Sequence, residues 1–160
     1  ESIASHGVRK AVVVNGHGGN VDALARAARQ LRREETAFAP TWNWWESIPE
    51  LSDDLFETDG GHAGPAEASL IYQVAADLLR EETLETAGEG APDSWGQTVH
   101  GAEVGFDTID FTPTGAVGDP TEASREAGET LFENASAELD SLLDWMTEQS
   151  FASLLPDSHQ

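Results

Sequence analysis

The stretch "VVVNGHGGN", residues 12–20, decides how the rest of the chain folds. Three consecutive valines favour a short β-strand, and the loop after them holds three glycines, two asparagines and His17. From Val21 to Arg33 apolar residues recur at helical spacing, with arginines at the solvent-facing positions and at the end. A strand, a glycine loop and a helix in this order predict one unit of a mostly parallel α/β sheet.

The loop from Asn15 to Asn20 occupies a position where α/β proteins bind ligands. It lies beyond the carboxyl end of a strand and directly before a helix. Its glycines let the backbone approach a ligand closely, and the two asparagine side chains can fasten the loop. Three interpretations remain open from the residues alone: a tight turn, a phosphate site at the helix N-terminus, and a metal site that includes His17. The phosphate interpretation lacks both the nucleotide-loop lysine and the G-x-G-x-x-G spacing.

Further elements are expected on both sides of this unit. The last turns of a helix are expected over Glu1–Gly7, with Gly7 as the stop, and a strand buried on both faces is expected over Lys10–Val14. Capping signals at Asp119, Pro120 and Glu122 predict the start of a final helix. The elements predicted along the chain are a strand within Thr36–Trp45, a helix from Pro65 to about Arg80 with Ile71, Val74, Ala75 and Leu78 inward, an exposed loop over Glu81–Gln97, short strands within Val99–Phe111, and a helix ending near Glu148 with Ala127, Leu131, Ala135, Leu139, Leu142 and Met146 inward.

The composition is strongly acidic. The chain has 30 acidic and 8 basic residues and a net charge of −22, which would repel nucleic acids and anionic membranes. The acids are spread along the chain, which is typical of the solvated surface of a protein from a high-salt cytoplasm. Because cysteine is absent, any metal site must use histidine and carboxylate ligands. We expect a cytoplasmic protein with one domain over residues 1–150 and a tail over 151–160.

A second group of polar residues stands in "DGGHAGPAEAS", residues 59–69. It contains Asp59, His62 and Glu67, and Glu67 falls in the first turn of the predicted helix, where the helix dipole favours a carboxylate. A capped helix start and a functional site both explain these residues. Two glycine-framed histidines that each precede a helix favour the second explanation. A tryptophan cluster at 42, 44 and 45 is explained either by core packing or by a pocket wall for a flat ring.

The two histidine motifs, together with "TGAVGDPTEAS" at residues 114–124, resemble the creatininase (creatinine amidohydrolase) family of metal-dependent amide hydrolases. The resemblance implies a three-layer α/β/α fold around a mostly parallel sheet, assembly into homo-oligomers, and two divalent metal ions per site, either zinc, manganese or iron. It implies that His17 is a metal ligand, that His62 is the catalytic histidine, and that Glu67 is a carboxylate linked to the metal or to catalysis. The residues expected to bind a small amide substrate are Asn15, Gly18, Trp44 and Trp45.

Two departures from the family pattern refine these expectations. Creatinine-cleaving members carry glutamate where this chain has Gly19, which argues against creatinine as the substrate. Family chains also carry a Glu-x-His pair and a bridging aspartate well before the glycine loop, whereas residues 1–11 hold no such arrangement. We therefore expect this chain to be the C-terminal portion of a member, with the other ligands supplied upstream.

The NGHGGN form of the loop resembles the branch that includes archaeal formamide hydrolases of flavin and deazaflavin synthesis, and the acidic composition suits a haloarchaeal member. The leading hypothesis is a metal-dependent amidohydrolase that acts on a cyclic amide or formamide, such as a formylaminopyrimidine. The alternatives are an inactive, truncated relative that serves as a binding or oligomerisation module, and a nucleotide-binding protein that grips phosphate with the glycine loop.

Overall fold

The computed structural model describes residues 2–58 and 61–156. The chain divides into two compact units, of which unit 1 comprises Glu1–Ser47 and Ala135–Gln160, and unit 2 comprises Ile48–Asn134. Among the helices of the described ranges, none is both long enough and apolar enough to cross a membrane.

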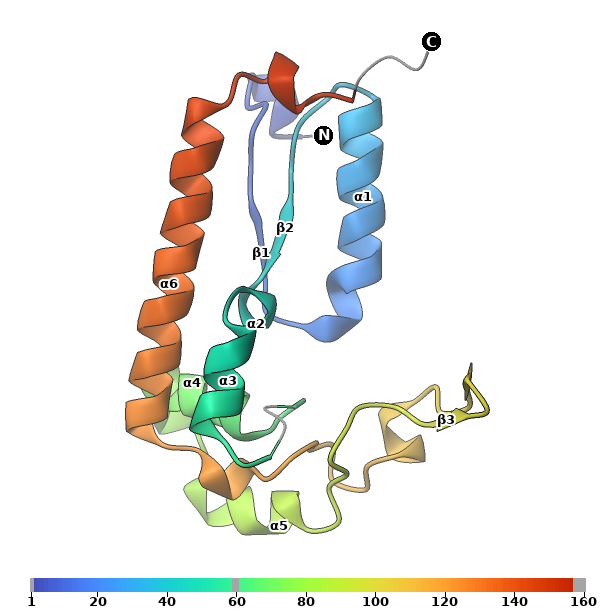
Figure 1. Ribbon diagram of the computed structural model, residues 1–160, viewed down its shortest axis with the longest axis vertical. Helices are drawn as coiled ribbons and strands as arrows, with labels where there is room; N and C mark the ends of the chain where they lie inside the picture. The colour runs from blue at the N-terminus through green and yellow to red at the C-terminus, as the bar shows by residue number, and fades with distance from the viewer. Residues whose placement is uncertain (1, 59–60, 157–160) are drawn as a thin grey trace. The chain divides into compact units, whose positions relative to one another are not determined.

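Unit 1 contains the predicted strand, loop and helix. Strand β1 (Val13–Asn15), the short 3-10 turn η2 (Gly18–Asn20), helix α1 (Val21–Arg33) and strand β2 (Thr41–Asn43) follow one another. The strands are parallel, and Asn15 is the register partner of Asn43. Figure 1 draws this pair between α1 and the later part of α6 (Arg125–Glu148). The expected α/β class, with helices flanking a parallel pair, is confirmed.

The expectation that the first strand is buried on both faces is wrong. The ladder is shorter than predicted, with an isolated bridge at Lys10 and Phe38 before the regular pairs begin. Val14 is 61% exposed. The physical reason is that successive side chains of a strand point to opposite faces: Asn15 is buried on one face, whereas the described residues leave the face of Val14 uncovered.

The ends of unit 1 are tied to its helices. The 3-10 turn η1 (Ala4–His6) stops at Gly7, whose φ of 86° is the left-handed conformation predicted for a stop signal. The guanidinium of Arg32 in α1 donates to the carbonyl of Leu154 (2.7 Å) in η7 (Ala152–Leu154), and Leu154 is buried. Residues 151–156 therefore pack against the rest of unit 1.

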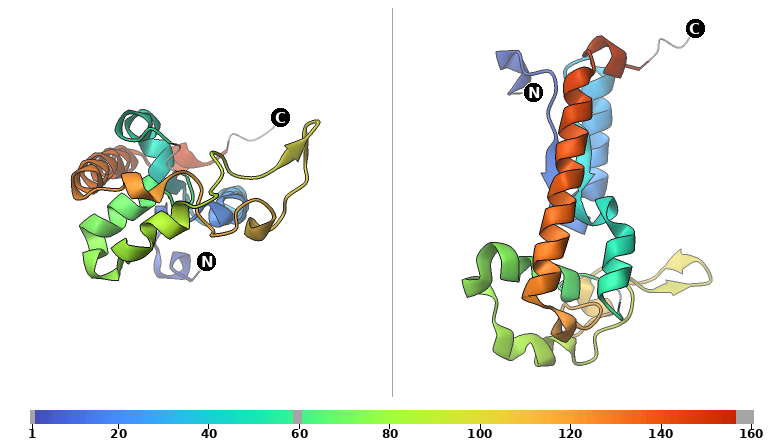
Figure 2. Two further views of the ribbon diagram at one scale, coloured as in Figure 1. Left: turned by 90° about the horizontal axis from the view of Figure 1, so that it is seen from below. Right: turned by 60° about the vertical axis from the view of Figure 1, so that its left-hand side comes forward.

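Unit 2 is built from short helices and loops, and Figure 2 shows it from two further directions. The hairpin of β3 (Thr98–Val99) and β4 (Ala102–Glu103), predicted as short strands, extends away from the helices of the unit in every view (Figures 1 and 2). The other elements are α3 (Pro49–Leu55), α4 (Pro65–Ala75), η3 (Ala76–Leu78), η4 (Glu81–Thr83), α5 (Leu84–Gly88), η5 (Thr108–Asp110), η6 (Pro120–Glu122) and the start of α6. Turn η4 and helix α5 lie where we expected only an exposed loop.

Helix α4 buries a different face from the predicted one. The expected inward stripe is largely exposed, with Val74 at 57% and Leu78 at 72%. The buried side carries small residues instead, because α6 approaches α4 so closely at Gly128 that a Cβ there would lie 2.0 Å from the carbonyl oxygen of Ser69. With the two helices this close, only small side chains fit on the face of α4 that lies against α6. The helix also ends at Ala75, earlier than predicted, and continues as η3.

Helix α6 confirms most of its predicted inward face, since Ala127, Leu131, Ala135 and Met146 are buried. Its start differs from the prediction. Asp119 caps η6, where its carboxylate accepts from the Thr121 amide, and the hydroxyl of Ser124 accepts from the Ala127 amide at the beginning of α6. Asp119 therefore caps η6, which is a separate turn before α6, and not α6 itself.

Candidate functional site

The carboxyl ends of β1 and β2 carry a network of amide side chains in unit 1. The Asn15 amide donates to the side-chain oxygen of Asn43 (2.8 Å) and to the His17 carbonyl (3.0 Å). The side-chain oxygen of Asn15 accepts from the His17 backbone amide (3.2 Å) and from the Asn20 side chain (3.2 Å). These four bonds use the full hydrogen-bonding capacity of an asparagine side chain. Asn15, which is buried, therefore fixes the glycine loop to the sheet.

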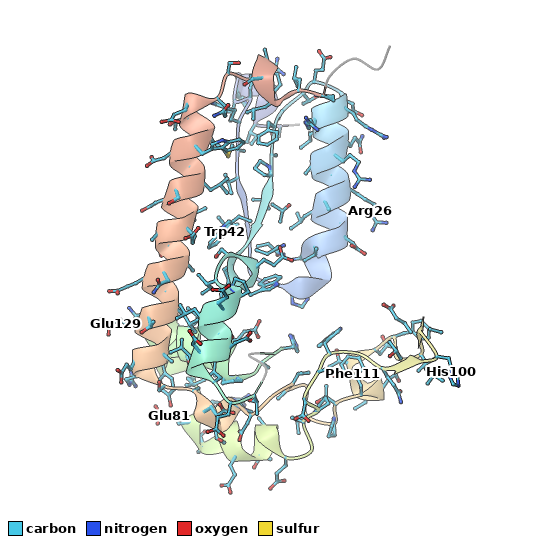
Figure 3. The ribbon with its side chains drawn as sticks, in the orientation of Figure 1. Arg26, Trp42, Glu81, His100, Phe111 and Glu129 are labelled. Atoms are coloured by element: carbon cyan, nitrogen blue, oxygen red, sulfur yellow. The ribbon has the colours of Figure 1, made fainter. Side chains whose placement is uncertain are left out.

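The same network continues along β2 into α2 (Trp44–Ser47). The Asn43 amide donates to the carboxylate of Glu46 (2.8 Å), so both strand-end asparagines are held on both sides. Trp44 and Trp45 follow directly and are half-buried, with their rings edge-to-face at a centroid distance of 6.1 Å. Figure 3 labels the neighbouring Trp42 on β2. Trp44 and Trp45 thus lie immediately after the strand end that carries the asparagine network.

His17 lies on the exposed surface of the glycine loop. Its ring covers Gly19, because a Cβ at position 19 would lie 2.7 Å from the imidazole Nε2 atom. Around the Cβ positions of Gly16 and Gly18, by contrast, no described atom outside the glycine and its two chain neighbours lies within 4 Å. The absence of a side chain at position 19 therefore makes room for the imidazole, whereas the space beside Gly18 is open.

His62 lies in a loop of unit 2 that is pinned to the third sequence motif. The backbone amide of Val117 donates to the His62 carbonyl (2.8 Å). Gly61 has a φ of 41°, and a Cβ there would lie 2.2 Å from the Val117 carbonyl oxygen, so only glycine fits. Asp59, the other acid of this motif, lies outside the described residues.

Glu67 is in the first turn of α4 and reaches back to the histidine loop. Its carboxylate accepts from the Ala63 backbone amide (2.7 Å), and Ala63 has a left-handed φ of 49°. The bond is favourable because the carboxylate lies at a helix N-terminus, where the dipole is positive. Glu67 therefore holds the backbone directly after His62 in place.

Glu122 is a positioning residue that the sequence analysis missed. Its carboxylate accepts from the Glu57 amide (2.6 Å), the Thr58 amide (3.2 Å) and the Thr58 hydroxyl (2.7 Å). The Thr58 hydroxyl oxygen also accepts from the Asp119 amide (2.9 Å). The sequence pattern places Glu122 among the capping signals of the final helix, although its place in the third family motif also points to another role. It anchors the segment that leads into the His62 loop.

An aromatic group beside His62 was also missed. The His62 and Trp95 rings meet edge-to-face at 5.0 Å, and Trp95 meets Phe111 at 4.7 Å. Figure 3 labels Phe111 and His100 on this segment. Sequence spacing gave no signal for this contact, because Trp95 is 33 positions from His62 in a stretch that lacks regular periodicity.

The described residues do not form a complete metal site by themselves. Within residues 2–58 and 61–156, no three histidine, aspartate or glutamate side chains gather as metal ligands would. His17 belongs to unit 1, whereas His62 and Glu67 belong to unit 2. The donor types of these three residues, imidazole and carboxylate, suit zinc, manganese or iron.

The parallel strand pair with flanking helices defines an α/β protein, and the polar loop that holds His17 follows the carboxyl end of β1, where α/β proteins bind ligands. The family model described as "Creatininase: Creatinine amidohydrolase" matches residues 1–143. The chain belongs to the creatininase family. Members of this family are metal-dependent amidohydrolases.

Two curated relatives are similar to the chain. A mycofactocin precursor peptide peptidase from Mycobacterium ulcerans is 32% identical over 121 residues, which cover 76% of this chain and 42% of the relative. Its counterpart from Mycolicibacterium smegmatis is 31% identical over 133 residues, or 81% of this chain and 46% of the relative. The chain thus spans less than half the length of either relative.

The fold is that of solved creatininases. A crystal structure of creatinine amidohydrolase matches with a TM-score of 0.68 at 24% identity, covering 93% of this chain and 60% of that one. A Zn-Zn form of a mutant creatininase (TM-score 0.67, 23% identity) and a manganese form (0.65, 20%) each match 92% of this chain and 60% of theirs. These likenesses confirm the creatininase-like α/β fold and show that such proteins bind divalent metals.

Proposed function

We propose that this chain is part of a metal-dependent amidohydrolase that cleaves the C–N bond of a formamide carried on a pyrimidine ring, or of a cyclic amide. The observation that carries the proposal is the network of Asn15 and Asn43, which fixes the His17 loop to the ends of two parallel strands in a chain of an amidohydrolase family. A polar loop held this firmly is typical of a site, because catalysis requires preorganised groups.

His17, His62 and Glu67 each have a proposed role in this reaction. His17 offers an exposed imidazole as a metal ligand, and Gly19 keeps room for the ring. His62 passes a proton to the departing nitrogen, which makes the amine a better leaving group. Glu67 holds the loop of His62 and is a second candidate ligand. A bound divalent metal ion supplies water of lowered pKa and polarises the amide carbonyl.

The residues proposed to bind the substrate belong to unit 1. We propose that Gly18 leaves space for the substrate, that Trp44 or Trp45 packs on it, and that Asn15 acts on binding through the loop it fixes. Zinc, manganese and iron all fit the proposed reaction, and so do two metal ions per site. Assembly into a homo-oligomer and a cytoplasmic location remain predictions.

A second candidate function follows from the curated relatives. Both are named as peptidases of a precursor peptide, and they share 31–32% identity with this chain. Hydrolysis of a peptide bond uses the same chemistry as hydrolysis of a formamide, since both break an amide C–N bond. Gly19 argues against creatinine itself as substrate for either candidate.

The test is an assay of the protein expressed from its complete gene. A formylaminopyrimidine and a short peptide are each supplied with zinc, manganese or iron, and released formate or cleaved peptide is measured. We expect metal-dependent release of formate that falls at least ~100-fold in His17→Ala and His62→Ala, since proton transfer alone contributes about 10²–10⁴-fold. His6→Ala, at an exposed histidine of η1, is the matched control and is expected to retain activity.

Other results would decide between the alternatives. Cleavage of the peptide without release of formate would establish the second candidate. An absence of metal and of turnover in the purified protein would contradict the proposal and favour a binding or oligomerisation module. Phosphate-ester binding that survives His17→Ala would favour a phosphate-gripping loop.

A further inference from the structure

Trp95 lies beside His62 and keeps much of its surface open. The two rings meet edge-to-face at a centroid distance of 5.0 Å and an angle of 74°, yet Trp95 is 57% exposed. Burial of a tryptophan is strongly favourable, since its side chain removes about 150–250 Å² from water. An indole that contacts a candidate proton-transfer group and stays open to solvent therefore suggests a ligand-binding surface.

The backbone of unit 2 holds His62 and the segment of Trp95 together. Two consecutive backbone amides of the third motif hold these two parts of the chain. The Val117 amide donates to the His62 carbonyl (2.8 Å), and the Gly118 amide donates to the carbonyl of Pro92, three residues before Trp95 (2.9 Å). The placement of the indole is thus coupled to that of the imidazole through a single stretch of backbone, in which Val117 is fully buried.

Phe111 supports the indole from another side. Its ring lies 4.7 Å from that of Trp95 at an angle of 73°. Gly105 allows the returning chain to approach, because a Cβ there would lie 3.2 Å from Phe111. The amide of Val104 donates to the Gln97 carbonyl (2.9 Å), which closes the hairpin after Trp95. The indole is therefore held by two rings and a hairpin while part of it remains exposed.

We propose that the exposed surface of Trp95 is a stacking platform for the flat heteroaromatic ring of the substrate, next to His62. This inference rests on the proposed function, and it adds the residue that recognises the flat ring of the substrate. Aromatic platforms recognise heterocycles through their π-faces, whereas a puckered aliphatic ring has no π-face to stack. Trp95 is thus a specificity-determining residue supplied by a segment without regular periodicity.

The test compares two formamides that differ only in the ring. N-formylaminopyrimidine offers a flat ring, and N-formylcyclohexylamine offers a puckered ring of similar size. We expect Trp95→Leu to raise KM for the pyrimidine about tenfold, the loss typical of one stacked base, and to leave KM for the cyclohexyl compound within about threefold. Trp95→Phe, which keeps a ring, is expected to restore most of the difference. Phe106→Ala is the matched control, because Phe106 is 83% exposed on the same segment.

Binding of aminopyrimidine, measured by calorimetry, gives a readout that does not depend on turnover. We expect it to bind the unsubstituted protein and Trp95→Phe, and to bind Trp95→Leu about tenfold more weakly. Equal KM changes for both formamides, or equal aminopyrimidine affinity in all variants, would overturn the proposal. If neither formamide is cleaved but aminopyrimidine binding depends on Trp95, the hydrolytic function fails and the stacking platform stands. Circular dichroism confirms that each variant is folded.

Discussion

The ammonium group of Lys10 donates hydrogen bonds to the carbonyl oxygens of Met146 (2.7 Å) and Gln149 (2.8 Å), and so caps the C-terminal end of α6. Lys10 is the only lysine of the sequence. A positive charge at a helix C-terminus satisfies carbonyls that lack partners within the helix and interacts favourably with its dipole. The chain's single lysine therefore stabilises the contact between the segment before β1 and the C-terminal end of α6.

Replacing Lys10 tests this cap. Lys10→Met keeps the aliphatic stem but removes the charged donors, and we expect it to lower the free energy of unfolding by about 1–2 kcal/mol. Urea denaturation measures the change. Arg29→Met, on the exposed face of α1, is the control and is expected to change stability by less than ~0.5 kcal/mol. Equal effects of the two substitutions would contradict the cap.

Gly128 is required by the close approach of α6 to α4. A methyl group in Gly128→Ala would meet the Ser69 carbonyl oxygen, and overpacking of this kind costs about 1–3 kcal/mol. The higher helix propensity of alanine offsets up to ~1 kcal/mol of that cost. We expect a net loss of stability in thermal unfolding, whereas Glu129→Ala on the exposed face is expected to be neutral. A gain of stability in Gly128→Ala would show that the helices separate easily.

Glu122 restrains the segment that leads to His62. Glu122→Ala removes the acceptor of three hydrogen bonds from Glu57 and Thr58, so the backbone amides of these two residues are expected to exchange hydrogen at least ~10-fold faster. Hydrogen exchange followed by NMR measures the change. In Glu126→Ala, which alters an exposed acid of α6, both amides are expected to keep their protection. Unchanged exchange in Glu122→Ala would mean that the segment is held by other contacts.

Asp119 makes stability depend on pH. Hydrogen bonds from the Thr121 hydroxyl and amide hold the pKa of Asp119 below its ordinary value of 3.8. Because the folded state binds this proton less readily than the unfolded state, the stabilisation is complete above the ordinary value and is lost as the pH falls through the lower, native value. Thr121→Val removes the hydroxyl and is expected to move the pKa of Asp119 back toward 3.8, whereas Thr121→Ser keeps it low. NMR titration of the carboxyl group distinguishes these results.

Local sequence signals predicted the elements around the glycine loop. The helix from Val21 to Arg33 matches its predicted bounds, because its apolar spacing and terminal arginines are local properties of the chain. The end of the last helix at Glu148 and most of its inward face were also predicted correctly. The site residues themselves remain predictions; Asn15 ends β1, and its side chain is hydrogen-bonded to that of Asn43 at the end of β2.

Tertiary contacts decided what the local patterns could not. The inward face of α4 depends on Gly128, which stands 59 positions after Ser69, and periodicity within one helix carries no information about so close a neighbour. Glu122 likewise holds a segment 64 and 65 positions earlier in the chain. The sequence around Glu122 predicts a local capping role instead, because a carboxylate near a helix start also satisfies local backbone amides.

The sequence by itself determined the α/β class, the strand, loop and helix of unit 1, and the family, because these depend on short-range spacing and on motifs with specific residues. Only the tertiary structure decided that Lys10 caps α6, that Glu122 anchors the approach to His62, and that Trp95 lies against the His62 ring. Each of these relationships joins residues far apart in the chain, and the energy of such contacts depends on distances that folding alone establishes.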